Sequence, residues 1–222
     1  MNLLKDMEDF KRKYLILAIV LLGLFIKGHG QTSEYRASVS VEKQLFKSLK
    51  IVVSPSFRTL KNFSTKEYLI DGGISFKPIK YIDFGALYRF DMVSADGKDA
   101  TYKHRYFFST QLRYSLFRLD AMARAMFTND GDAGIFSEDR NNYMRYRLKL
   151  KYNIKSFKLT PFISAEYFYQ LNDREFNKSR YTIGGEYKIS KSHSVVFEYS
   201  WQDYLKKDKT LNIFSLGYNF NF

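Results

Sequence analysis

The residues with the most evident chemistry are positive side chains that alternate along one short segment. Arg145, Arg147, Lys149 and Lys151 occupy every second position of YMRYRLKLKYNI. Successive side chains of a β-strand point to opposite faces, so these four share one face if the segment is a strand. Like charges at this spacing repel one another unless acids or water screen them. The segment therefore predicts a face in contact with water, with acidic partners at similar depth.

The acids available for such pairing are Glu166, Glu186 and Glu198, which occupy the polar phase of the later segments. Arg105, Arg113 and Arg124 add positive charge to the same phase upstream. Two arrangements fit this distribution. In one, a basic wall faces an acidic wall across a narrow pore. In the other, ion pairs across or along the wall constrict the interior.

Catalytic and metal chemistry have little support in the sequence. His104 and His193 have no second histidine, cysteine or acidic cluster at ligand spacing, so we expect no metal and no cofactor. The motif G-x-S-x-G is absent, and we expect a protein that is not an enzyme. Oxygen ligands in the loop 129–139 suit Ca²⁺, but their spacing is not that of an EF-hand and favours a solvated loop.

The elements that would hold these side chains are strands. Apolar and polar residues alternate with period two through most of the chain, as in the final TLNIFSLGYNFNF, which is typical of strands with one apolar face. Short connections at 77–80, 115–118, 154–158 and 190–193 alternate with longer polar ones at 59–66, 93–101, 129–142, 172–179 and 202–209. This alternation predicts an all-β fold, an up-and-down antiparallel transmembrane β-barrel of the outer membrane.

A soluble β-sandwich or lipocalin-like barrel would show the same alternation with its apolar face inside. Aromatic residues make up 18% of this chain, and tyrosines crowd the apolar phase. Tyrosine hydroxyls need partners in a dry core but suit a membrane interface. A closed barrel also pairs its backbone groups within a bilayer. We therefore favour an apolar face that contacts lipid.

The first thirty residues have the order of a secretory signal peptide. Basic residues at 11–13 precede an apolar run at 15–26, and Gly28 and Gly30 supply small residues. We predict cleavage after Gly30, with a signal peptide at 1–30 and the barrel at 31–222. Without cysteine the chain has neither disulfides nor a lipid attachment site. Export argues against nucleic acid as the partner of its net charge of +13.

The number of strands is set by one ambiguous segment. Ten strands follow from about residue 49, and YRASVSVEK (35–43) also alternates. If this segment crossed the membrane, it would start outside the cell, and bacterial barrels have even strand numbers. We predict ten full strands, with twelve as the alternative, and a segment 35–43 that is partial or lies in the lumen.

Several stretches resemble a small outer-membrane barrel family of unknown function, DUF2490. They are SVEKQL, RYFFSTQLRYSL, YRLKLKYNIKSFKLTPFISAEYFYQLN and RYTIGGEYKISKSHSVVFEYSW. The resemblance implies fold and location, and it brings no activity. The ending GYNFNF is similar to the last strand of outer-membrane barrels, which implies that the barrel-assembly machinery reads Tyr218, Phe220 and Phe222.

The expected function follows from the width of the barrel. Ten strands enclose little more space than eight, whose side chains fill the interior. We therefore expect a narrow or plugged charged lumen and a structural or interaction role. Its partners would be outer-membrane lipid, the barrel-assembly machinery and a surface or membrane-complex protein. The main alternative is an anion-leaning channel or porin for small solutes. A membrane-embedded hydrolase is the third and weakest alternative.

Overall fold

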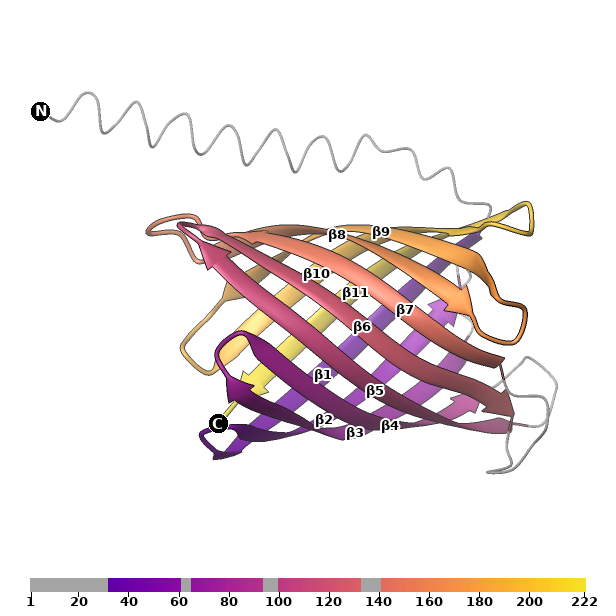
Figure 1. The fold of residues 1–222 in the computed structure, drawn as a ribbon, viewed down its shortest axis with the longest axis horizontal. Helices are drawn as coiled ribbons and strands as arrows, with labels where there is room; N and C mark the ends of the chain where they lie inside the picture. The colour runs from indigo at the N-terminus through magenta and orange to yellow at the C-terminus, as the bar shows by residue number, and fades with distance from the viewer. Residues whose placement is uncertain (1–31, 61–64, 94–99, 133–140) are drawn as a thin grey trace, which may run out of the picture.

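The fold is a closed β-barrel, seen in a computed structural model that describes residues 32–60, 65–93, 100–132 and 141–222 (Figure 1). The expected signal peptide lies outside these residues, as do parts of the loops expected at 59–66, 93–101 and 129–142. Within the described ranges, no helix is long and apolar enough to cross a membrane. The described strands are β1 (Thr32–Phe46), β2 (Leu49–Leu60), β3 (Thr65–Ile79), β4 (Ile82–Val93), β5 (Thr101–Leu116), β6 (Leu119–Asp132), β7 (Asn141–Tyr152), β8 (Leu159–Gln170), β9 (Glu175–Lys188), β10 (His193–Tyr204) and β11 (Lys209–Asn221).

Sequential strands pair antiparallel, and the barrel closes where β1 meets β11 in parallel. The described chain thus has eleven strands, one more than the ten favoured from the sequence. The segment 35–43 is neither partial nor inside the lumen, because it belongs to a full strand of the wall. β1 pairs with β2 on one side and with β11 on the other, from Thr32↔Leu211 to Glu42↔Asn221. Parallel closure removes the even-number requirement, since only an all-antiparallel ring needs it.

The connections alternate between the two rims of the barrel as the sequence indicated, but the described ones do not differ consistently in length. Tight turns join β1 to β2, β3 to β4 and β5 to β6, and short segments join β7 to β8 and β9 to β10. We call this end the tight-turn rim and the other the long-loop rim. Two expected loops are shorter than predicted, because β9 already begins at Glu175 and β10 continues to Tyr204.

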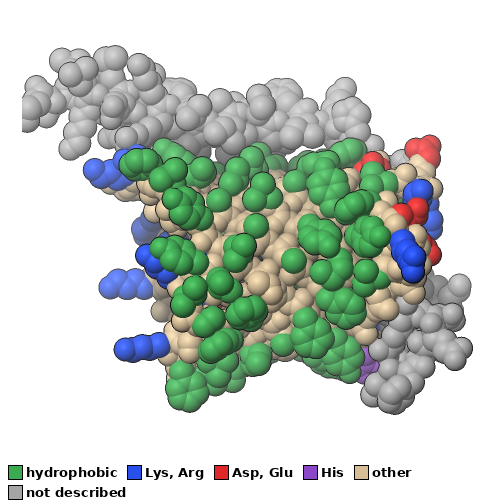
Figure 2. All heavy atoms as spheres, viewed as in Figure 1, with side chains coloured by type: hydrophobic (Ala, Val, Ile, Leu, Met, Phe, Trp, Pro, Cys, Tyr) green, Lys and Arg blue, Asp and Glu red, His purple; other side chains and the backbone are tan. Residues whose placement is uncertain are grey.

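The outer face of the barrel is apolar. Phe108, Ile163 and Leu216 are each more than half exposed, although their side chains are large and apolar. Aromatic side chains pair across neighbouring strands on this face, as Tyr35 does with Phe214 at 5.5 Å between ring centroids. Figure 2 shows hydrophobic side chains over the middle of the barrel and charged side chains at its two ends. An exposed apolar face of this extent needs an apolar surrounding, because large apolar patches are rare on soluble proteins.

The buried residues lie inside the barrel, toward the long-loop rim. Leu69, Ile213, Glu34 and Asp91 are almost completely buried. The two carboxylates each meet an arginine: Glu34 accepts from Arg36, and Asp91 lies 2.9 Å from Arg105 Nε. Buried charges are tolerated when they are paired, so this part of the interior is a core of ion pairs and apolar side chains.

A basic cavity in the barrel lumen

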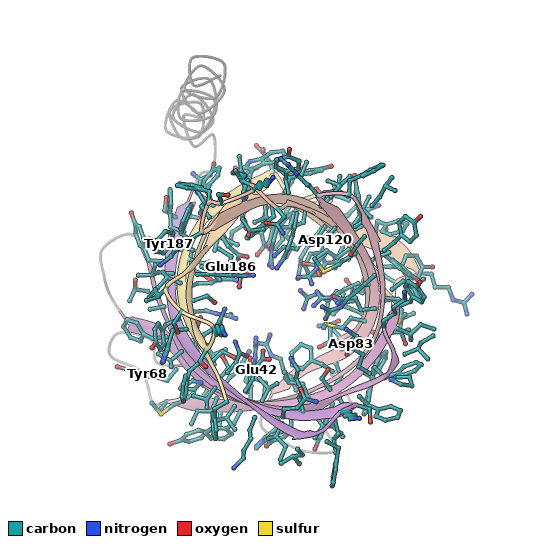
Figure 3. The ribbon with its side chains drawn as sticks, turned by 90° about the vertical axis from the view of Figure 1, so that its left-hand side faces the viewer. Glu42, Tyr68, Asp83, Asp120, Glu186 and Tyr187 are labelled. Carbon is teal, nitrogen blue, oxygen red and sulfur yellow. The ribbon has the colours of Figure 1, made fainter. Side chains whose placement is uncertain are left out.

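The charged residues expected in the interior lie on six consecutive strands, β5 to β10, in the phase that faces the lumen. In the view down the barrel, Glu42, Asp83, Asp120 and Glu186 point inward, whereas Tyr68 and Tyr187 point outward (Figure 3). The expected residues in phase with the inward set are Arg105, Arg113, Arg124, Arg145, Arg147, Lys149, Lys151, Glu166, Glu186 and Glu198.

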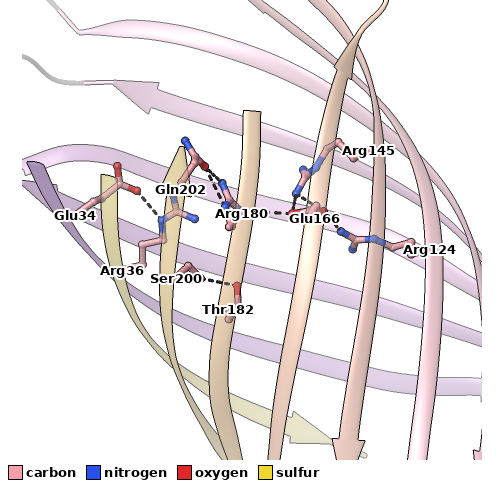
Figure 4. Close-up of polar contacts among 9 residues, drawn as sticks. All are labelled: Glu34, Arg36, Arg124, Arg145, Glu166, Arg180, Thr182, Ser200 and Gln202. Atoms are coloured by element: carbon pink, nitrogen blue, oxygen red, sulfur yellow. Dashed lines mark hydrogen bonds and ion pairs between the residues drawn. The ribbon is translucent and has the colours of Figure 1, made fainter. Parts of the chain in front are cut away.

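Glu166 on β8 is the centre of the charged cluster. Arg145 Nη2 donates to both of its oxygens at 3.0 and 3.1 Å, and Arg124 Nη2 donates to Oε1 at 2.7 Å. Arg180 Nη1 lies 3.7 Å from Oε2 (Figure 4). The Glu166 side chain is only 5% exposed. One buried carboxylate therefore serves three guanidinium groups from β6, β7 and β9.

Arg147 is the direct register partner of Glu166 and, on its other side, of Arg124. Nevertheless it makes no hydrogen bond or ion pair with any residue that the structure describes, because its neighbours occupy both Glu166 oxygens. A like charge directly across an antiparallel pair is unfavourable. Register thus places Arg147 at the height of Glu166, but the two side chains form no ion pair.

Lys149, the next inward residue of β7, is held by a ring rather than by a close acid. Its Nζ lies 3.4 Å from the ring centroid of Phe162 and 3.9 Å from Glu198 Oε1. Phe162 lies over Gly184, where an added Cβ would stand 2.7 Å from the ring. Nearer the tight-turn rim, Lys151 donates to Glu186 at 3.1 Å. Lys149 is thus held by a cation–π contact, with its nearest acid beyond hydrogen-bond distance.

These side chains enclose a cavity of about 280 Å³ at mid-height in the lumen. Seven cations and two carboxylates line it, together with small hydroxyl side chains: the cations are Arg36, Arg89, Arg124, Arg145, Arg147, Lys149 and Arg180, and the acids are Glu166 and Glu198. The cations exceed the acids, so the potential of the cavity is positive and attracts anions.

Of the two arrangements that the sequence left open, the structure shows ion pairs along the wall rather than a basic wall facing an acidic wall. The acids of β8, β9 and β10 lie next to cations of β7 and β9 and pair with them along the wall. Arg180 was not among the lumen charges expected from the sequence. It adds a cation to the cluster from β9, which lies between β8 and β10.

Strands β1 to β5 carry ion pairs that were not predicted from the sequence. Asp71 accepts from Arg89 Nε at 2.6 Å, and Arg58 Nη1 donates to Glu67 at 2.8 Å. Asp83 lies 3.0 Å from Arg113 Nη2. We call the inward charges of β1–β5 the paired wall and those of β6–β9 the basic wall. The available signal was an acid and an arginine two residues apart, as in Arg89 and Asp91, which places both on one face.

The two histidines that the structure describes, His104 and His193, form hydrogen bonds on the outer face. His104 Nδ1 is hydrogen-bonded to the Tyr88 hydroxyl, and His193 Nδ1 lies 2.5 Å from the Tyr218 hydroxyl. Among the described residues, no group of three or more His, Cys, Asp or Glu could hold a metal ion.

The C-terminal aromatic residues extend the apolar face to the tight-turn rim. Phe222 is 56% exposed and stacks on Phe220 at 5.2 Å. Its amide donates to the Glu42 carbonyl at 3.0 Å, so the last residue is still paired with β1. The hydroxyl of Tyr218, on the same face, forms a hydrogen bond with His193 Nδ1.

The fold and the lumen define an outer-membrane-type β-barrel with a basic interior. The family described as "Protein of unknown function (DUF2490)" matches residues 37–211, and the chain belongs to this family. Among solved structures, the chain is similar to the translocator domain of the autotransporter NalP from Neisseria meningitidis, at 12% identity over 91% of each chain and a TM-score of 0.34. No curated protein matches the sequence.

Proposed function

We propose that this chain is an outer-membrane barrel whose lumen admits small anions, the channel that the sequence analysis held as its main alternative. The observation that carries the proposal is the cavity of about 280 Å³ lined by seven cations and two carboxylates. A pore that lines its narrow part with one sign of charge raises the local concentration of counter-ions. Rings of arginine and lysine are the usual lining of anion-selective pores.

An aqueous lumen is consistent with the charge distribution. The cations of the basic wall outnumber its acids, and an excess charge in a dry interior costs on the order of several kcal/mol per ion. Lumen water and mobile anions would supply the missing screening. In Figure 3 the drawn side chains reach inward from the wall and leave the middle of the view clear.

The second candidate is the narrow or plugged barrel with a structural or interaction role. It is supported by the buried ion pairs of Glu34 and Asp91, by the inward Phe168 near the long-loop rim and by Phe107 in the cavity lining. In this case the lumen charges hold the barrel together, and a surface or membrane-complex partner would bind the loops. In both cases the proposed role involves no catalysis.

The proposed location rests on the apolar outer face and its charged ends. The chain would be exported by its N-terminal signal peptide and inserted by the barrel-assembly machinery, with the long-loop rim outside the cell. Epitope tags in 172–174 or 205–208 should then be labelled on intact cells, and tags at 190–192 should not. Equal labelling of both rims would contradict this orientation.

Conductance in planar bilayers tests the channel. The purified barrel should give single-channel currents, and the zero-current potential in a potassium chloride gradient should have the sign of chloride preference. A barrel that inserts and conducts nothing would favour the plugged alternative. A barrel that prefers potassium would exclude the basic cavity as the part that sets selectivity.

A further inference from the structure

We infer that the lumen cavity holds a binding site for a multivalent oxyanion of the phosphate class, centred on Arg147 and Lys149. This inference rests on the proposed aqueous lumen and deepens it, since it names a ligand that is retained rather than merely attracted. A planar guanidinium recognises phosphate and carboxylate oxygens through paired hydrogen bonds, which a chloride ion cannot accept in the same way.

Arg147 has hydrogen-bonding capacity that no described residue uses. Its guanidinium has five donors and, among the described residues, no hydrogen bond or ion pair. It is nevertheless part of the cavity lining, beside the three arginines that share Glu166. Four guanidinium groups around one carboxylate leave a local positive excess, which a bound anion with more than one negative charge would offset best.

A second cation and several hydroxyl groups surround Arg147 in the cavity. Lys149, two residues along β7, has its nearest carboxylate oxygen at 3.9 Å, beyond hydrogen-bond distance. Ser164 is its register partner on β8 and lines the same cavity. Thr182 and Ser200 lie farther along the wall with their hydroxyl oxygens 2.7 Å apart, and they line the cavity as well. Cations and hydroxyls of this kind are typical ligands of phosphate oxygens.

The volume of the cavity suits a small ligand. Ligand pockets for drug-sized molecules usually have about 300–1,000 Å³. The cavity of about 280 Å³ is smaller and suits inorganic phosphate with water, or a small phosphate monoester. Its walls are polar and charged, so a large apolar solute is disfavoured.

Isothermal titration of the purified barrel in detergent tests the site independently of conductance. Inorganic phosphate is titrated at constant ionic strength in chloride, and glycerol 3-phosphate is titrated in parallel. The wild type should bind at least one of them. Tighter binding of the monoester assigns the site to organic phosphates, and tighter binding of the free ion assigns it to phosphate itself.

The matched variants are Arg147→Gln and Arg113→Gln. Both remove one lumen guanidinium, but Arg113 pairs with Asp83 and does not line the cavity. Arg147→Gln should weaken phosphate binding at least about tenfold, the loss expected for a charge-assisted hydrogen bond. Arg113→Gln should change it less than about twofold, since its charge is distant and screened. If Arg147→Gln does not fold, Lys149→Gln replaces it with an expected loss of several-fold.

Three results would overturn the site: no phosphate binding by the wild type, binding unaffected by the change at Arg147, or equal losses in both variants. The last would show that only the net lumen charge matters. A wild-type barrel that conducts chloride without binding phosphate would keep the channel and exclude the site. One that binds phosphate without conducting would keep the site and exclude the channel.

Discussion

The paired wall and the basic wall of the lumen balance their buried arginines with carboxylates in different ways. In the paired wall, acids and arginines alternate, so that Arg58, Arg89 and Arg105 each have a carboxylate at 2.9 Å or less. In the basic wall, Arg124, Arg145 and Arg180 share Glu166, and Arg147 has no direct partner among the described residues. Both halves have the same backbone pairing and the same alternation of faces.

This difference separates two uses of lumen charge. A wall whose charges are matched one for one is stabilised locally and has little residual field. A wall with excess cations gives up part of that stabilisation, because like charges repel, and keeps a positive potential for a solute. The paired wall therefore mainly stabilises the interior, although Arg36 and Arg89 also line the cavity, and the basic wall supplies the other five cations of the cavity.

The largest effect is expected at the shared carboxylate. Glu166→Gln keeps the shape of the side chain but leaves three arginines without their acid. Removing one partner of a buried ion pair typically costs about 3–5 kcal/mol. Unfolding in urea, followed by heat-modifiable migration on gels, should show a large loss. Asp71→Asn in the paired wall should cost less, because Arg89 keeps Asp91 at 3.8 Å. Equal losses would contradict the contrast between the walls.

The next largest effect is a difference in stability between changes at Arg145 and Arg147, two inward residues of β7. Arg145 donates two hydrogen bonds to Glu166 and lies 4.7 Å from the Phe168 ring centroid, so Arg145→Gln should cost about 1.5–3 kcal/mol. Arg147→Gln removes a cation that faces Arg124 and has no direct partner. It should leave the stability unchanged or raise it, as measured by the same urea titration. A loss at Arg147 as large as that at Arg145 would reveal a stabilising contact of Arg147.

A smaller effect is expected on ion preference. Lys149→Gln should shift the zero-current potential toward cations, since Lys149 lines the cavity and its acid is 3.9 Å away. Lys50→Gln is the control, because Lys50 donates to Glu42 at 3.2 Å and does not line the cavity. Its shift should be distinctly smaller. Identical shifts would mean that selectivity does not depend on the mid-lumen cavity.

The smallest effect is expected outside the lumen. Lys206 donates to Glu175 at 2.8 Å in the connection between β10 and β11, and this hydrogen bond raises the pKa of Lys206. Lys206→Ala should nevertheless cause no measurable change in the urea midpoint, because exposed ion pairs contribute little and are screened by salt. A clear loss of stability would show that charges at the long-loop rim matter as much as those inside.

The sequence predicted the strands and faces because period two is a local property. The side of the barrel on which Arg145 or Glu166 lies follows from counting along one strand. The strand number did not follow, because the pairing of β1 with β11 joins distant segments and has no local signal. The partner of Glu166 did not follow either. Register places Arg147 beside it, yet arginines on three other positions are long enough to reach the same oxygens.

The parallel closure also has a kinetic consequence for folding. Every other neighbouring pair of strands can form from adjacent parts of the chain, whereas the closing pair joins its two ends: Thr32 Oγ1 contacts the Thr210 carbonyl, 178 residues away. Contacts this distant in sequence carry the largest entropic cost of loop closure and slow folding. An open eleven-stranded sheet, with the edges of β1 and β11 unpaired, is therefore the expected last intermediate. Its lifetime determines how long two bare edges are open to pairing with another chain.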